Sequence, residues 1–181
     1  HFYLIHCDVL TSPVISIFGY KYYLLILDNF LHYLLTFPLR QKSDTFPTLS
    51  HFFAWASTQF SRTIRSIQCD NGREFYNSVS RDFFLSRGVH LRMSCPYTSP
   101  QNGRAERMIR TTNDVVRSLL FQASLPASYW AEALGTATYL LNRLPTKAVA
   151  HPTPSHFSAS TPPMIIFVSL GAHATVISPP L

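Results

Sequence analysis

Three acidic residues occupy positions where a carboxylate is badly placed for packing. Asp8 interrupts an apolar run near the start of the chain, Asp70 follows a second strand-like run, and Glu106 opens a helix-like run, with 35 residues between Asp70 and Glu106. An ionised carboxylate loses hydration that apolar neighbours cannot replace, so such residues belong in a functional site. Hard carboxylate oxygens are the ligands that Mg²⁺ prefers. The three acids therefore predict a two-metal centre for phosphoryl transfer, which clamps the attacking and leaving oxygens.

The hydrophobic pattern indicates the elements that must position these acids. We predict strands at residues 2–10, 20–28, 32–38, 65–70 and 89–93, and helices at 43–60, 74–87, 104–122 and 129–143. Short connections make the first three strands antiparallel neighbours, whereas alternation with helices indicates parallel pairing and right-handed crossovers for the last two. The predicted fold class is α/β, with a mixed five-stranded sheet flanked by helices on both faces. Ser43 is the expected N-cap of the first helix, and Pro47 predicts a late start or a kink there.

Composition favours one domain with a polyanionic partner. The chain has 181 residues, is 46% hydrophobic, and carries 15 Lys and Arg against nine Asp and Glu, with a pI of about 9.5. No apolar run approaches the roughly 20 residues that span a bilayer, and no signal-peptide pattern opens the chain, so we expect no membrane association.

Other polar residues have simpler explanations. The three cysteines show no metal-binding spacing and their odd number disfavours a disulfide framework; Cys7 and Cys69 are expected to be small buried residues. Asp28 is expected to form a turn with Asn29. The histidines are poor candidates for the metal site, because Mg²⁺ prefers oxygen to imidazole.

Six segments, in this order, resemble the integrase catalytic core of copia-type long-terminal-repeat retrotransposons, which belong to the retroviral integrase superfamily with its ribonuclease H-like fold. Between Ile5 and Lys147 they read HCDVLTSPV, GYKYYLLILDNF, FPLRQKSD, QCDNGREF, SCPYTSPQNGRAER and LPASYWAEALGTATYLLNRLPTK. The resemblance implies that the strands of Asp8 and Asp70 are neighbours. It also implies that these aspartates and Glu106 are catalytic and bind two Mg²⁺ or Mn²⁺ ions.

The same resemblance implies a polynucleotidyl transferase that acts in the nucleus. Such a core trims the 3′ ends of retroelement cDNA and joins them to host target DNA, and it works as a homo-oligomer. A ribonuclease H shares the fold and the metal chemistry, but the QNG and LPASYW segments resemble integrases instead. The alternative is a catalytically silent retrotransposon remnant, or a repurposed module that only binds nucleic acid.

DNA contacts are expected on the helix that carries Glu106 and on the loop before it. Arg104, Arg107 and Arg110 follow at three-residue spacing and share one helix face, which is either merely solvated or, as we favour, bound to DNA phosphates. Tyr97 and Asn102 lie in a turn-rich loop, where they contact DNA or simply shape the loop. We expect this loop to close over DNA, so that Glu106 stands away from the aspartates beforehand.

The last 34 residues differ from the family pattern. Residues 148–181 contain six prolines and no Lys, Arg, Asp or Glu. Reading the back-translated PPMIIFVSLGAHAT one base earlier permits TYDHLRVFGCACY, which resembles the sequence that related elements have here. We therefore predict an integrase core at residues 1–147 and a poorly ordered, out-of-frame tail at 148–181. The expected zinc-binding segment before the core and the basic region after it are missing from this sequence.

Overall fold

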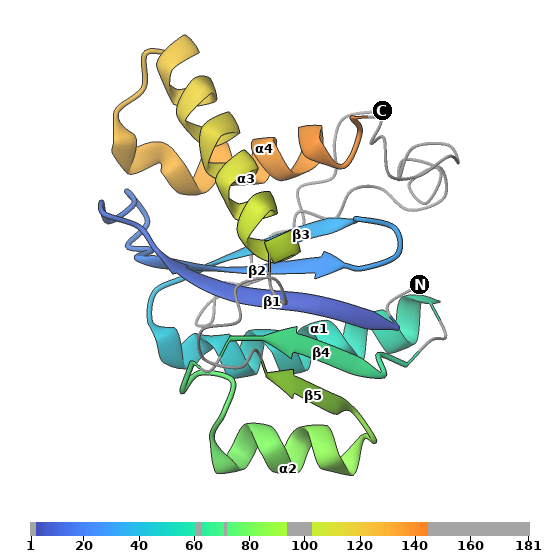
Figure 1. The fold of residues 1–181 in the computed structure, drawn as a ribbon. Helices are drawn as coiled ribbons and strands as arrows, with labels where there is room; N and C mark the ends of the chain where they lie inside the picture. The colour runs from blue at the N-terminus through green and yellow to red at the C-terminus, as the bar shows by residue number, and fades with distance from the viewer. Residues whose placement is uncertain (1–2, 61–62, 71, 94–102, 145–181) are drawn as a thin grey trace.

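A computed structural model describes residues 3–60, 63–70, 72–93 and 103–144. Its strands are β1 (Leu4–Thr11), β2 (Tyr22–Asp28), β3 (Leu34–Leu39), β4 (Ser66–Cys69) and β5 (His90–Met93). Its α-helices are α1 (Thr45–Phe60), α2 (Ser78–Ser86), α3 (Gly103–Gln122) and α4 (Trp130–Leu141), and short 3₁₀ turns η1 (Lys42–Asp44) and η3 (Ala127–Tyr129) precede α1 and α4 (Figure 1).

The five strands form one mixed sheet in the order β3-β2-β1-β4-β5. The pairs β1–β2 and β2–β3 are antiparallel, and the pairs β1–β4 and β4–β5 are parallel. The predicted fold class is confirmed. Because β1 is the middle strand and β4 lies beside it, the two strands that lead to Asp8 and Asp70 are hydrogen-bonded neighbours.

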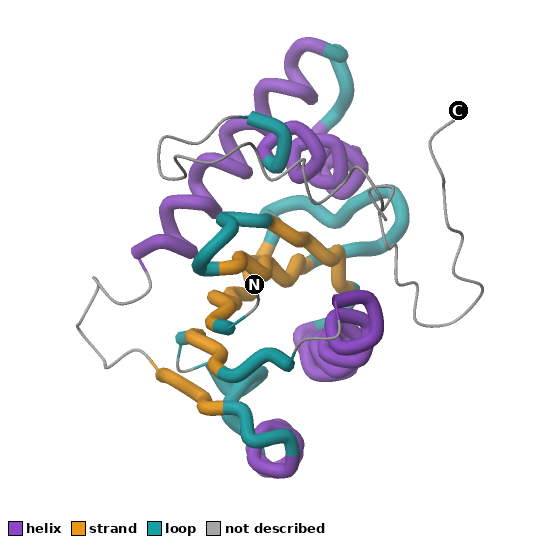
Figure 2. The backbone as a smooth tube through the Cα atoms, turned by 90° about the vertical axis from the view of Figure 1, so that its right-hand side faces the viewer, coloured by secondary structure: helices purple, strands orange, loops and turns teal. Residues whose placement is uncertain are grey.

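Helices cover both faces of the sheet, and each face has its own hydrophobic core (Figure 2). On one face, Ile5, Cys7, Ile67 and Cys69 belong to the cluster that packs under α1 and α2. On the other face, the cluster under α3 and α4 includes Leu25, Leu27, Ile109, Val116, Trp130 and Leu134. Side chains alternate between the faces along a strand. The expectation that Cys7 and Cys69 are buried is confirmed, since both are 0% exposed.

The first helix begins later than Ser43. Residues 42–44 form η1, and the side chain of Asp44 accepts a 3.0 Å hydrogen bond from the backbone N–H of Gln41. Helix α1 then begins at Thr45, which places Pro47 at its third position. Pro47 is tolerated there, because the first N–H groups of a helix have no intrahelical partner. The predicted late start is confirmed.

Two other boundaries are set by turns that the pattern did not reveal. Strand β3 begins at Leu34 because His32, with φ of 56°, has left-handed backbone in the preceding turn. Helix α2 begins at Ser78, four residues after the predicted start. Its N-cap is Asn77, whose side chain accepts a 2.8 Å bond from the N–H of Ser80.

Parts of the predictions lie outside the described residues. Among these are Tyr97 and Asn102 on the loop before α3, and the tail at 148–181. Within the described residues, none of the helices has the length and apolar character needed to cross a membrane.

Candidate functional site

Asp8 and Asp70 lie on the same side of the sheet. In β1, Ile5, Cys7 and Val9 pack with the α1 and α2 cluster, so the alternate position of Asp8 faces α3 and α4. In β4, Ile67 and Cys69 pack with that same cluster, which leaves Asp70, just after the strand, for the opposite face. In the parallel register His6 pairs with Gln68, so Asp8 lies level with Asp70 at the edge where β4 ends. The two carboxylates are therefore neighbours at this edge.

The Asp70 carboxylate is held by a tight turn. Its Oδ1 accepts a 3.0 Å hydrogen bond from the backbone N–H of Gly72, and the turn continues with the N–H groups of Phe75 and Tyr76, which both donate to the Gly72 carbonyl. A Cβ placed on Gly72 would lie 2.9 Å from Asp70 Oδ1 and 2.7 Å from Glu74 Cδ. A side chain at position 72 would therefore have to displace the carboxylate ends of Asp70 and Glu74.

Glu74 is a site residue that our sequence analysis missed. Its Oε2 lies 2.8 Å from the position of a Cβ on Gly72, and Asp70 Oδ1 lies 2.9 Å from the same point. Lys42 Nζ forms a 3.5 Å ion pair with Glu74 Oε1, and the Glu74 side chain is only 11% exposed. The signal was available in the sequence, because a second acid four residues after Asp70, across a glycine, can return to the same turn.

Glu106 approaches the aspartates from the first turn of α3. Ala105, Ile109, Thr112 and Val116 are the buried face of this helix, which rests on β1 and β2. Glu106 follows Ala105 directly and is half-buried at the border of that face. Packing of α3 on the sheet thus fixes the direction from which Glu106 comes.

The electrostatics of Asp8 show that these acids influence one another. Burial and, after it, the negative charge of Asp70 raise the pKa of Asp8 from 3.8 to about 6, and Glu106 and Glu74 contribute to this rise. A hydrogen bond from the backbone of Val9 acts in the opposite sense. Ionised Asp8 is therefore disfavoured until a cation offsets the surrounding negative charge.

A pre-assembled metal site is absent from the described residues. No three of their His, Cys, Asp and Glu side chains lie close enough together to hold an ion. The chemistry of the donor set nevertheless fits Mg²⁺ or Mn²⁺, because every acid around Asp8 offers carboxylate oxygens.

The three arginines that we predicted to bind DNA differ in their contacts within the protein. Arg104 Nη1 donates to the side-chain oxygen of Asn29 at 2.8 Å and lies 3.4 Å from the Asn29 backbone carbonyl. Arg107 and Arg110 are exposed, and neither forms an ion pair with the described residues. Asp28, in contrast, shapes a turn as expected, since its Oδ2 accepts a 2.6 Å bond from the N–H of Leu31.

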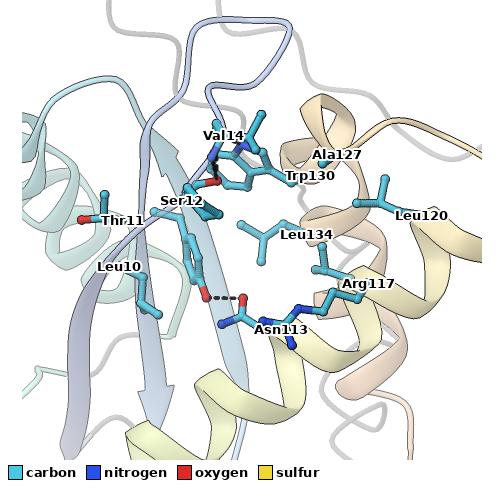
Figure 3. Close-up of a pocket in the computed structure, with 13 residues that line it drawn as sticks. Leu10, Thr11, Ser12, Val14, Asn113, Arg117, Leu120, Ala127, Trp130 and Leu134 are labelled. Carbon is cyan, nitrogen blue, oxygen red and sulfur yellow. Dashed lines mark hydrogen bonds between the residues drawn. The ribbon is translucent and has the colours of Figure 1, made fainter.

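A cavity of about 220 Å³ lies farther along β1 and α3 than the acids do. Figure 3 shows Asn113 and Arg117 of α3 on one side of it and Trp130 and Leu134 of α4 on another. The Tyr23 hydroxyl donates to Asn113 Oδ1 at 2.9 Å, and Trp130 Nε1 donates to the Val14 carbonyl at 2.9 Å. None of the four acids lines this cavity.

Comparison with known families decides the classification of the chain. The sequence profile described as Integrase core domain matches residues 1–99, more than half of the chain. The chain belongs to the integrase core domain family. The matched range contains Asp8, Asp70 and Glu74 and ends before Glu106.

Relatives of this integrase core domain include plant retrotransposon polyproteins. The chain is 36% identical over 159 residues to the retrovirus-related Pol polyprotein from transposon RE2 of Arabidopsis thaliana, which covers 88% of this chain and 11% of the polyprotein. It is 34% identical over 152 residues to that from transposon TNT 1-94 of Nicotiana tabacum, which covers 83% of this chain and 11% of the polyprotein. The resemblance to retrotransposon integrase cores is confirmed, and the chain spans about a tenth of these relatives.

A solved structure supports the fold of this integrase core domain. The model resembles a chain of the cryo-EM structure of the simian T-cell lymphotropic virus intasome in complex with PP2A regulatory subunit B56 gamma, with a TM-score of 0.68 and 15% identity. The match covers 98% of this chain and 58% of the other. It shows that the fold is that of an integrase core, as the ribonuclease H-like prediction requires.

Proposed function

We propose that this chain is the polynucleotidyl transferase core of a retrotransposon integrase. It processes the 3′ ends of retroelement cDNA and joins them to host target DNA. The observation that carries this proposal is the meeting of Asp8 and Asp70 at one sheet edge, with the charge of Glu106 reaching Asp8. Membership of the integrase core domain family supports the same reaction class.

Asp8, Asp70 and Glu106 are the residues that would hold Mg²⁺ or Mn²⁺, and Glu74 lies close enough to Asp70 to influence that site. Two bound ions would activate the attacking hydroxyl and neutralise the charge that develops on the phosphate. Asp8 must be ionised to act as a ligand, which its neighbours oppose in the absence of a cation. The chain itself supplies the orientation of the acids through β1, β4 and α3.

Arg107 and Arg110 are proposed to bind the DNA backbone. They project from the helix that carries Glu106, and guanidinium groups suit phosphate oxygens. Tyr97 and Asn102 remain predicted DNA contacts. Concerted insertion of two cDNA ends requires at least two catalytic sites, so we propose a homo-oligomer that acts in the nucleus, where host DNA is found.

The test is Mn²⁺- or Mg²⁺-dependent strand transfer, or its reversal on a branched DNA that mimics a joined product. Asp70→Asn should abolish the activity while circular dichroism and thermal unfolding show a folded protein, because the change removes a ligand charge but little volume. Asp114→Asn is the matched control: it neutralises an exposed acid of α3. A wild-type chain that is folded, binds Mn²⁺ and stays inactive would favour the silent-remnant alternative. Full activity in Asp70→Asn would remove Asp70 from the site.

A further inference from the structure

Three polar side chains form a continuous hydrogen-bonded link between α3 and the centre of the sheet. Arg104 Nη1 donates to Asn29 Oδ1 at 2.8 Å, and His6 Nε2 lies 3.1 Å from the same oxygen. Asn29 is itself fixed by its backbone N–H, which donates to the Leu4 carbonyl at 3.0 Å. The turn after β2 thus holds both the start of α3 and the first half of β1.

The shared acceptor determines the state of His6. An amide oxygen only accepts hydrogen bonds, so His6 Nε2 is the donor in this contact. His6 is only 5% exposed, and among the described residues its Nδ1 has no hydrogen-bond partner. The buried ring therefore has a second nitrogen without a partner on the α3 face of the sheet.

Gln68, on the neighbouring strand β4, has a buried side-chain nitrogen as well. It is the register partner of His6 in the parallel β1–β4 pair, and it is 8% exposed. Its Nε2 is also buried and lacks a partner among the described residues. Two buried nitrogens that lack partners among the described residues therefore occupy paired register positions on β1 and β4.

The positions of these residues repeat one relationship to the acids. Arg104 precedes Glu106 by two residues, His6 precedes Asp8 by two, and Gln68 precedes Asp70 by two. In the two strands a step of two residues returns to the same face. We propose that Arg104, Asn29, His6 and Gln68 form a clamp that sets the position of the Glu106 helix start relative to the two aspartates. The members are positioning residues, and Asn29 is the one that joins helix to sheet. The existence of the clamp does not depend on the proposed function. Only the metal-binding role of the acids that it positions rests on that function.

The clamp gives Arg104 a second role besides its predicted contact with DNA. Arg104 donates a guanidinium N–H to Asn29, whereas neither Arg107 nor Arg110 forms an ion pair with a described acid. Loss of the Asn29 oxygen should therefore loosen the first turn of α3 more than the rest of that helix.

The experiment is hydrogen exchange of the wild-type chain and its Asn29→Ala, Asn29→Asp and Arg104→Met variants. Amides of residues 107–110 bond to the carbonyls of the first helical turn, so they report its fraying. Asn29→Ala and Arg104→Met should speed their exchange about tenfold. Asn29→Asp keeps an acceptor oxygen and should retain protection. Asn113→Ala is the matched control, because it removes the bond from Tyr23 to the same helix two turns farther on.

A second measurement separates positioning from simple stabilisation. Calorimetric titration with Mn²⁺ should show about tenfold weaker binding in Asn29→Ala and near wild-type binding in Asn29→Asp and Asn113→Ala, as expected for residues that orient ligands. Unchanged exchange at 107–110 in Asn29→Ala overturns the clamp. Faster exchange with unchanged Mn²⁺ affinity overturns its positioning role. A wild-type chain that does not bind Mn²⁺ counts against the proposed function instead, and the exchange data still decide whether the clamp exists.

Discussion

The backbone N–H of Gly72 donates a 3.0 Å hydrogen bond to Oδ1 of Asp70. This contact closes a turn directly after β4 and orients the carboxylate before any cation is bound. The carboxylate ends of Asp70 and Glu74 both lie within 3 Å of where a side chain at position 72 would begin.

Gly72→Ala should therefore damage the site more than the fold. The added methyl group would displace the ends of two flexible side chains, Asp70 and Glu74, rather than backbone. Because Ala also reduces the freedom of the unfolded chain, the free energy of unfolding should change by less than about 1 kcal/mol. Strand transfer and Mn²⁺ affinity should fall at least tenfold. Activity that is retained in a folded variant would mean that the turn does not set the ligand geometry.

The burial of Asp8, together with repulsion from nearby acids, predicts an unusual pH dependence of stability. The folded-state pKa of about 6 exceeds the ordinary value of 3.8, so the folded state holds this proton more tightly than the unfolded chain. The free energy of unfolding should then fall as pH rises from about 4 to 6, and the Asp8 contribution should be constant above that range. The whole effect is of the order of 3 kcal/mol.

Asp8→Asn, which resembles the neutral acid, should remove that fall. Denaturant unfolding of both proteins at pH 4 and pH 7, without divalent cations, measures this effect. The free energy of unfolding of the variant minus that of wild type should be larger at pH 7 than at pH 4, by up to about 3 kcal/mol. Parallel pH curves for the two proteins would show that Asp8 is not perturbed.

Arg107 and Arg110 should contribute to DNA binding through charge alone. Replacing each with Ala should lower the slope of log K against log salt by roughly one, because one fewer phosphate contact releases fewer counterions. Melting temperature should hardly change, since exposed charges contribute little to folding. Arg87→Ala is the control, because this exposed arginine lies at the end of α2 on the opposite face of the sheet. If the slope is unchanged in all three variants, Arg107 and Arg110 are part of a solvated helix face that does not bind DNA.

Much of this architecture could be predicted because it depends on local pattern. Apolar runs located the five strands, and short or helical connections indicated which pairs are antiparallel and which are parallel. The placement of β4 beside β1, however, came from the family resemblance. Composition and periodicity do not specify which strand docks beside which across a long crossover.

The site was harder to predict where it depends on turns and side-chain contacts. Asp8 and Asp70 stood out because a charge ends or interrupts an apolar run. Glu74 did not, because an acid near a helix start has an ordinary explanation in the helix dipole. The ion pair between Glu74 and Lys42, and the contact between Arg104 and Asn29, depend on tertiary geometry that joins residues 32 and 75 positions apart.

The central position of β1 has a consequence for how the chain folds. The β1–β2–β3 meander is joined by short turns, but β4 reaches β1 only after the chain has passed through α1. Contacts between distant segments form slowly, because loop-closure entropy is lost before they are gained. The mutual repulsion of Asp8 and Asp70 therefore arises only once β4 has docked. Relieving it should leave the folding rate nearly unchanged and make the native protein slower to unfold.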